Sequence, residues 1–230
     1  MQHPTERVDT WEMVMVHRLF RREFRLLPGL IRDVADGDRQ RADVVGDHLT
    51  NLSDGLHHHH EGEDELLWPV LVHRVGLRAD LVHRMEGQHA RLQALLDEIG
   101  GVNPRWRATA TTADRDRLAD LAAQASAALD EHLADEETEL LPLVEEYVTP
   151  AEWHALNQRA QRTLPKNAKI LVFLGAILEE ATDREAAMFM RQLPWPVRLI
   201  WRLAGRRAYS RALARVRGTD RSPQPSPSRG

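Results

Sequence analysis

The sequence contains no cysteine, which excludes disulfides, thiolate metal sites and a cysteine nucleophile, and suits a reducing compartment. It has no run of about 18 or more apolar residues, so no transmembrane helix is predicted. The first residues lack the basic-then-apolar pattern of a signal peptide. The net charge is only −4, so the molecule as a whole is not expected to bind nucleic acid. Together these absences predict a cytoplasmic protein.

Strand signals are also missing, because no alternating apolar and polar run stands out. Apolar residues instead recur at spacings of three and four, which predicts amphipathic helices over residues 9–36, 39–73, 78–100 and 112–147. Gly100 and Gly101 are expected to end the third helix, with a loop over 101–112. The predicted fold class is all-α, an antiparallel up-down four-helix bundle over residues 9–147 with additional C-terminal helices. Residues 148–217 are expected to form that helical extension, and 218–230 a disordered tail.

Histidine is the abundant residue, with 12 in the chain. Four of them, His57–His60, run directly into an acidic stretch in the middle of the chain. Such a run repels itself when charged and buries badly when neutral, so a metal is the first candidate to explain it. Three pairs in this stretch lie four residues apart and so share a helix face: His57 with Glu61, His59 with Glu63, and His60 with Asp64. Only His59 and Glu63 continue the apolar stripe of their helix.

An internal repeat supports that choice of pair. A shift of 73 residues places Pro69 on Pro142, His59 on His132 and Glu63 on Glu136. A shift of 72 residues places His17 on His89. A duplicated helix pair would therefore direct four histidines and two glutamates into one core. Ionised carboxylates are costly to bury without a cation, and this residue set suits two first-row transition metals.

These residues give the pattern H…HxxxE…H…HxxxE, and in this the chain resembles the hemerythrin-like family, or HHE cation-binding domain, over about residues 9–147. The flanking segments 17–23 and 63–69 are also similar to bacterial members. The resemblance implies a non-haem di-iron centre with two iron ions, whose metal ligands would be His17, His59, Glu63, His89, His132 and Glu136. It also implies a small-molecule partner, namely oxygen, peroxide or nitric oxide, in redox or iron homeostasis. Enzymatic turnover, sensing, and a structural helical protein with incidental metal all remain open.

The chain departs from oxygen-carrying hemerythrins, which have His-x-x-x-His on the third helix and His-x-x-x-x-Asp on the fourth. Met85 stands four residues before His89, and a thioether is a poor ligand for hard iron. The missing ligand is expected to leave an open position, which favours reaction over carriage, or to be replaced by His60, His83 or a tyrosine. Glu137 is a rival to Glu136. A ferritin-like alternative is weak, because Glu86-x-x-His89 has no counterpart before His132.

Two further groups of residues carry hypotheses. Asp64 and His60 are candidates for second-shell partners that orient the ligands. Residues 194–217 combine arginines with apolar residues, which is typical of a basic amphipathic helix. This segment is expected to dock on the bundle, or else to contact a membrane surface or a partner protein, with nucleic acid as the least favoured alternative.

Overall fold

The computed structural model describes residues 7–76, 79–163 and 169–218, and within these ranges every regular element is a helix. The all-α prediction is confirmed. The predicted tail beyond Gly218 lies outside the described residues. No helix in the described ranges is long and apolar enough to cross a membrane. The elements are α1 (Trp11–Arg32), α2 (Arg39–Leu66), α3 (Trp68–Val75), α4 (Ala79–Thr109), α5 (Thr112–Asp135), the π-helix η2 (Glu136–Leu140), α6 (Leu141–Tyr147), α7 (Pro150–Thr163), α8 (Lys169–Glu179), α9 (Asp183–Gln192), α10 (Trp195–Ile200), the π-helix η3 (Trp201–Gly205) and α11 (Arg206–Arg217).

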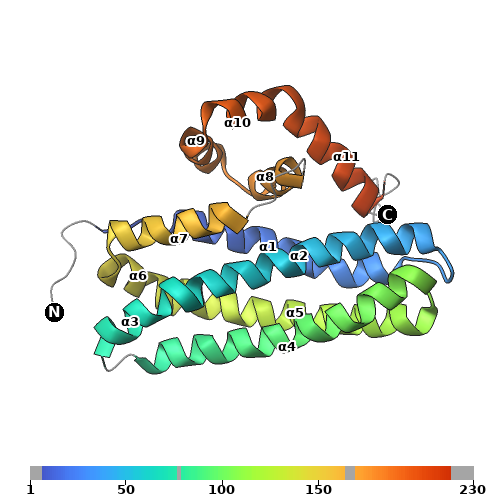
Figure 1. Ribbon diagram of the computed structural model, residues 1–230, viewed down its shortest axis with the longest axis horizontal. Coiled ribbons are helices and arrows are strands. Elements are labelled where there is room, and N and C mark those ends of the chain that lie inside the picture. The colour runs from blue at the N-terminus through green and yellow to red at the C-terminus, as the bar shows by residue number, and fades with distance from the viewer. Residues whose placement is uncertain (1–6, 77–78, 164–168, 219–230) are drawn as a thin grey trace, which may run out of the picture.

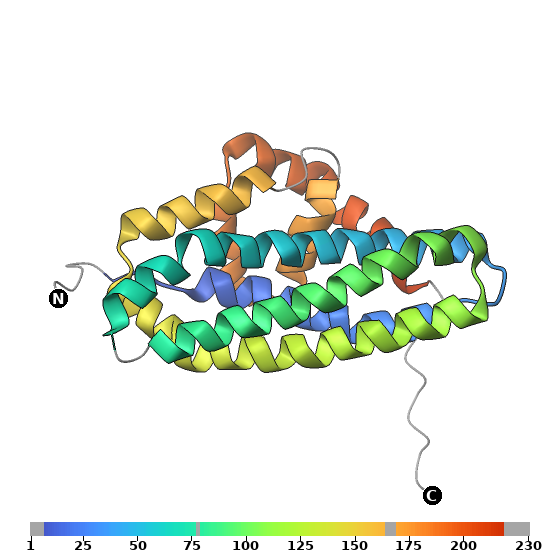
Figure 2. The ribbon, with the colours of Figure 1, turned by 60° about the horizontal axis from the view of Figure 1, so that its bottom comes forward.

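Four long helices, α1, α2, α4 and α5, lie side by side along the longest axis, and the chain reverses direction at each end (Figures 1 and 2). We call these four helices the bundle. Within it α1 packs on α2 and α5, and α4 packs on the same two helices. Each helix therefore has two neighbours, so the arc that it buries is wider than a single stripe.

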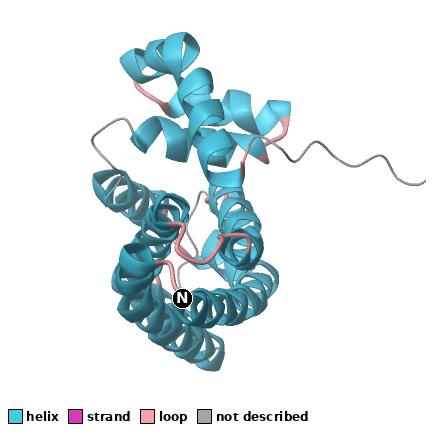
Figure 3. Cartoon of the chain, turned by 90° about the vertical axis from the view of Figure 1, so that its right-hand side faces the viewer, coloured by secondary structure: helices cyan, strands magenta, loops and turns pink. Residues whose placement is uncertain are grey.

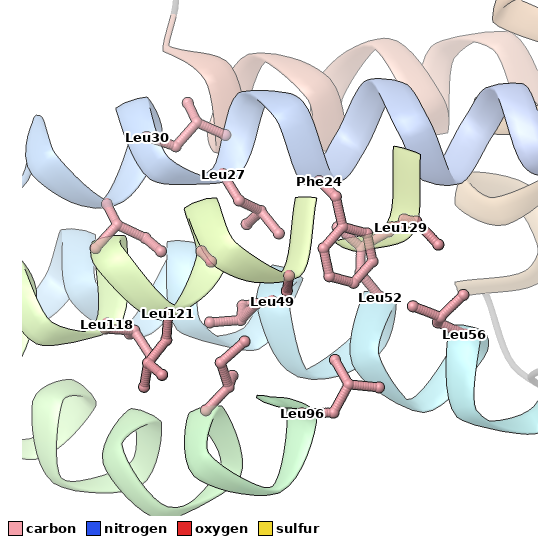
Figure 4. Packing of buried hydrophobic residues seen from close by; sticks show 14 of the residues in the cluster. Phe24, Leu27, Leu30, Leu49, Leu52, Leu56, Leu96, Leu118, Leu121 and Leu129 are labelled. Carbon is pink, nitrogen blue, oxygen red and sulfur yellow. The ribbon is translucent and has the colours of Figure 1, made fainter. Parts of the chain in front are cut away.

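The apolar core of the bundle is divided into two clusters. The larger one contains leucine and phenylalanine side chains from all four helices (Figure 4). The smaller one gathers around α3 and α6 at the other end. Each bundle helix contributes a buried polar residue near the place where the two clusters meet: His17 on α1, Glu63 on α2, His89 on α4 and His132 on α5. We call these residues and the polar side chains that contact them the polar layer.

The third long helix differs from its prediction. It continues through Gly100 and Gly101 to Thr109, so no loop forms over 101–112. Tertiary contacts outweigh the local glycine signal here, because Trp106 is fully buried and the Asn103 amide donates to the Gly46 carbonyl at 2.9 Å. Gly46 lets the helices approach this closely, since a Cβ added there would lie 2.6 Å from Asn103 Oδ1.

The two repeated prolines start new helices. The helix predicted over 39–73 ends at Leu66, and α3 begins again at Trp68. Pro69 and Pro142 both lie in the first turn of a short helix, where the missing N–H group is not needed. On α1, by contrast, the helix continues past Pro28 to Arg32.

The C-terminal helices lie together on one side of the bundle (Figure 3). α7 packs on α2, and α8 packs on α1. Arg22 of α1 donates to the Ala176 carbonyl at 3.0 Å, and Arg217 of α11 bonds to the buried Glu23 at 2.7 Å. Burial opposes ionisation of Glu23, but hydrogen bonding from His48 and the nearby positive charges outweigh it and lower the pKa of Glu23 to about 2. The buried carboxylate of Glu23 therefore joins the C-terminal extension to the bundle through its ion pair with Arg217.

Glu152 connects α7 to α3. Its carboxylate accepts hydrogen bonds from Arg74 at 2.7 and 2.8 Å and from the backbone N–H of Thr149 at 2.9 Å. The Arg74 hydrogen bond is the main cause that lowers the pKa of Glu152 to about 2. Since the folded pKa lies below the unfolded one, the stability that this carboxylate contributes is present above pH 4.5 and lost as the pH falls toward 2.

Replacing Glu152 by glutamine should therefore lower the unfolding free energy by about 1–2 kcal/mol at pH 7, because both partners are nearly one-third exposed and solvent screens them. The difference in unfolding free energy between the wild type and this variant should shrink as the pH falls from about 5 to about 3. Urea unfolding at several pH values measures it, with exposed Glu131→Gln as the matched control. A pH-independent difference would contradict the assignment.

Candidate metal centre

The second bundle helix contributes three side chains to the polar layer: His59, His60 and Glu63. Glu63 is fully buried, and its Oε1 lies 3.3 Å from His59 Nε2. Its other oxygen, Oε2, lies 3.5 Å from His89 Nε2 on α4. The Glu63 carboxylate therefore faces a different imidazole with each of its two oxygens.

The other carboxylate, Glu136, comes from the junction between α5 and η2. It is fully buried, and its Oε2 lies 3.4 Å from His17 Nε2 and 3.6 Å from His132 Nε2. The wider turns of η2 begin at this residue, and π-turns inside helices are frequent at functional sites. Glu136 thus lies between one imidazole from α1 and one from α5.

Three of the imidazoles are oriented by an acceptor at their outer nitrogen. His17 Nδ1 lies 2.9 Å from Glu137 Oε1, His89 Nδ1 lies 2.8 Å from Asp64 Oδ1, and His132 Nδ1 lies 3.1 Å from Gln88 Oε1. When Nδ1 carries the proton and donates it outward, Nε2 presents a lone pair to the interior. His89 Nε2 and His132 Nε2 are only 3.2 Å apart, and two lone pairs at that distance require a proton or a metal ion between them.

Seven buried side-chain atoms of this layer have no hydrogen-bond partner among the described residues: the Nε2 atoms of His17, His59 and His60, and both carboxylate oxygens of Glu63 and of Glu136. Buried polar groups are nearly always paired. Six residues of the layer form two groups in which one ligand atom from each member lies within 4.8 Å of the others: His17, His59 and Glu63 in one, and His60, Glu63, His89 and His132 in the other, whereas Glu136 belongs to neither. Glu63 belongs to both groups. This donor set of imidazole nitrogens and carboxylate oxygens fits divalent transition metals.

Burial controls protonation throughout the layer. It raises the pKa of Glu63 well above its usual range, and the neighbouring Glu136 and Asp64 raise it further. It also raises the pKa of Glu136. Burial lowers the pKa of His59 and of His60 well below the usual value, and together with His89 and His17 it lowers the pKa of His132 to about 2. These three imidazoles are therefore neutral at pH 7, as metal ligands must be.

The chain was compared with models of known protein families. Residues 8–144, more than half of the chain, match the model of the hemerythrin HHE cation-binding domain. The chain belongs to the hemerythrin family. Neither a curated protein nor a solved structure matches it. Its hemerythrin domain includes all four bundle helices and the whole polar layer.

All six predicted metal ligands of this hemerythrin domain meet in the layer. Asp64 lies outside it, where it accepts from His89. The rival Glu137 also lies outside, because it pairs with His17 Nδ1 and with Arg21 at 2.7 Å. Burial opposes the ionisation of Glu137, but hydrogen bonds with His17 and Arg21 prevail and lower its pKa. Glu136 thus lies inside the layer, between His17 and His132, and Glu137 lies at its outer edge beside His17 Nδ1.

His60 lies deeper than predicted from its position off the apolar stripe. Its side chain is 6% exposed, its ring stacks on His89 with centroids 4.0 Å apart, and it belongs to one of the ligand groups. The alternative candidate His83 is exposed and pairs with Glu86. His57 and His58 also stay near the surface beside Glu61.

Two orienting residues, Gln88 and Arg21, were not predicted from the sequence. Gln88 is fixed in turn by Asp135, which accepts from its amide at 3.0 Å. Arg21 follows His17 by four residues, which is about one helical turn, and this spacing could have indicated that the two side chains lie on the same face of α1. Gln88 directly precedes His89 but reaches His132 on the neighbouring helix, so no spacing along one helix could reveal it.

Proposed function

We propose that this hemerythrin-family chain holds two iron ions in an up-down four-helix bundle and uses them to react with or sense oxygen, peroxide or nitric oxide. One observation carries the proposal: Glu63 belongs to two groups of potential metal ligands, and both of its oxygens are buried without a hydrogen-bond partner among the described residues. A carboxylate with its oxygens toward two imidazole groups suits a pair of ions. Imidazole and carboxylate together suit iron.

The proposed ligands of the first ion are His17, His59 and Glu63. Those of the second are His89, His132 and Glu63, with Glu136 between His17 and His132. Bound iron would supply redox and small-ligand-binding chemistry at positions that the side chains leave open. The outer acceptors hold the Nδ1 protons and so keep each Nε2 lone pair turned inward, while the two apolar clusters exclude water from the layer.

His60 is the proposed replacement for the ligand that Met85 cannot supply. Met85 is buried in the smaller apolar cluster, whereas His60 belongs to the same potential ligand group as Glu63, His89 and His132, and its Nε2 is buried without a hydrogen-bond partner among the described residues. Three imidazoles would then serve the second ion and only two the first. An open position for a small molecule is therefore expected on the side of His17 and His59.

Iron analysis with a visible spectrum tests the proposal. Protein loaded with ferrous iron under anaerobic conditions and then exposed to air should contain about two irons per chain and show oxo-bridged di-iron bands. A content below about one metal per chain without those bands would instead indicate a helical protein with incidental metal.

Turnover and sensing are separated by a second measurement. Iron-loaded protein that consumes peroxide catalytically would be an enzyme, whereas a sensing module would show essentially no turnover. Sensing has one supporting observation: Arg18, next to His17, donates to the Glu180 carbonyl at 3.1 Å and pairs with Glu185. The helix that carries His17 is thereby connected to the C-terminal extension.

A further inference from the structure

The helical turns of α10 and η3 expose a concentration of large apolar side chains. Trp195 is 68% exposed, Leu199 45%, Ile200 50% and Leu203 70%. Among the described residues only one other large apolar side chain, Leu26 at 37%, is exposed. Four of five such residues therefore lie within nine positions of the chain, and a gathering of this kind marks an interaction site.

The opposite face of the same segment is already used for packing within the chain. Trp201 and Gly205 are buried, and a Cβ added to Gly205 would lie 2.1 Å from the Trp201 ring. A Cβ added to Gly175 of α8 would similarly lie 2.2 Å from the Tyr209 ring. These close contacts fix which face is turned inward, so the apolar residues at 195, 199 and 203, spaced by four, are held outward. In Figure 1 α10 lies on the side of the extension away from the bundle.

Arginines accompany this apolar face. Arg198, Arg202 and Arg206 follow one another at spacings of four and are all exposed. None of the three has a carboxylate partner in the described part of the chain, unlike Arg217, which pairs with Glu179 and Glu23. The sequence has no acidic residue between Glu185 and Asp220, although the whole chain carries a net charge of −4. The positive charge is thus local to this face.

We propose that this face binds the surface of an anionic lipid bilayer. We call it the α10 surface, comprising Trp195, Arg198, Leu199, Ile200, Arg202 and Leu203. The apolar side chains would enter the boundary between headgroups and acyl chains, where tryptophan is favoured. The arginines would bury their stems and direct their guanidinium groups to lipid phosphates. The segment lies on the membrane in this arrangement and does not cross it.

The charge on the α10 surface favours a lipid over a second copy of the chain. A twofold dimer through this surface would place arginines opposite arginines, which opposes association. Nucleic acid would satisfy the arginines but leave the leucines and Ile200 in water. An anionic bilayer satisfies both kinds of side chain at once.

The test is flotation of the iron-loaded full chain with vesicles of phosphatidylcholine and phosphatidylglycerol in a ratio of about 7:3, compared with vesicles of phosphatidylcholine alone. The wild type should float with the anionic vesicles and remain below with the neutral ones. Binding should weaken as salt is raised, because screening reduces the arginine contribution. Tryptophan emission should shift to the blue on binding, and Trp195→Phe should remove most of that shift.

Two pairs of variants separate the apolar contribution from the charge. The double substitution Leu199→Glu and Leu203→Glu should reduce partitioning at least about tenfold, whereas Leu26→Glu on α1 should leave it unchanged. Arg198→Glu with Arg202→Glu should reduce it by about thirtyfold or more. The matched control is Arg32→Glu with Arg91→Glu, two exposed arginines of the bundle, and it should retain most of the binding.

Three outcomes would overturn the proposal. The first is absence of flotation with anionic vesicles at low salt. The second is anionic binding that Leu199→Glu with Leu203→Glu does not change, which would indicate adsorption by charge alone. The third is a concentration-dependent dimer in light scattering that Leu203→Glu dissociates in the absence of vesicle binding, which would assign the α10 surface to a second copy. Circular dichroism of each variant shows that a loss of binding is not a loss of fold.

Discussion

Replacing Glu63 by glutamine is expected to reduce the metal content from about two ions per chain to below one. Glutamine keeps the volume of the side chain, so the packing of α2 is preserved. Its neutral amide has one oxygen, whereas the carboxylate directs one oxygen to His59 and the other to His89. Both proposed ions would lose a ligand through one substitution. Metal analysis of protein loaded and desalted in parallel with the wild type provides the measurement.

In the metal-free protein, the same substitution should raise the free energy of unfolding. Burial raises the pKa of Glu63 above its unfolded value, so the stability that this group contributes is present below about pH 4.5 and is lost as the pH rises through the folded pKa. At pH 7 this buried carboxyl therefore has a cost in unfolding free energy for the metal-free wild type. Glu63→Gln avoids that cost and should be the more stable protein without metal.

Glu61→Gln provides the matched control for both measurements. Glu61 precedes Glu63 by two residues on α2 but is 40% exposed and pairs with His58 and Arg159. Its substitution should leave the metal content unchanged. Retention of both ions by Glu63→Gln, or their loss in Glu61→Gln, would contradict the proposed ligand set.

The meeting of the six proposed ligands in one layer could be predicted from the sequence because two independent regularities select these residues. Helical periodicity places His59 and Glu63 on the buried stripe of α2, and the repeat places His132 and Glu136 at the corresponding positions of α5. His60 could not be predicted in this way. A bundle helix has two neighbours, so α2 directs His59 toward His17 of α1 and His60 toward His89 of α4. A prediction that assumes one buried stripe on each helix counts only one of these two directions as buried.

The helix boundaries show where local signals suffice. Thr149 and Thr182 cap their helices through reciprocal bonds with Glu152 and Glu185, and in both cases the two partners lie only three residues apart in the sequence. Gly100 and Gly101 are local signals too, but they are overruled by contacts from a distant segment. Asn103 bonds to Gly46, 57 residues away, and a separation of that kind leaves no trace in local composition.

Removing the metal from the wild type should lower its unfolding free energy by about 4 kcal/mol for each ion that was held at a thousand times its dissociation constant. For a chain of this length, that corresponds to a fall of about 10 °C or more in Tm. The physical reason is the position of the polar layer. It borders both apolar clusters and carries seven ligand atoms without a hydrogen-bond partner, contributed by α1, α2 and η2, so without a cation the bundle retains their desolvation cost and loses the compensation.

Thermal unfolding with and without a chelator, followed by hydrogen exchange, measures this effect and locates it. Exchange should increase most in the turns around His59 and Glu136. The interior near Trp106, at the far end of the larger cluster, should change least, because apolar packing holds it independently of the layer. Glu63→Gln should show little further loss on chelation, since it has already lost the ions. If chelation leaves the Tm of the loaded wild type unchanged, the layer is held together by its own protons, and the proposed metal centre is wrong.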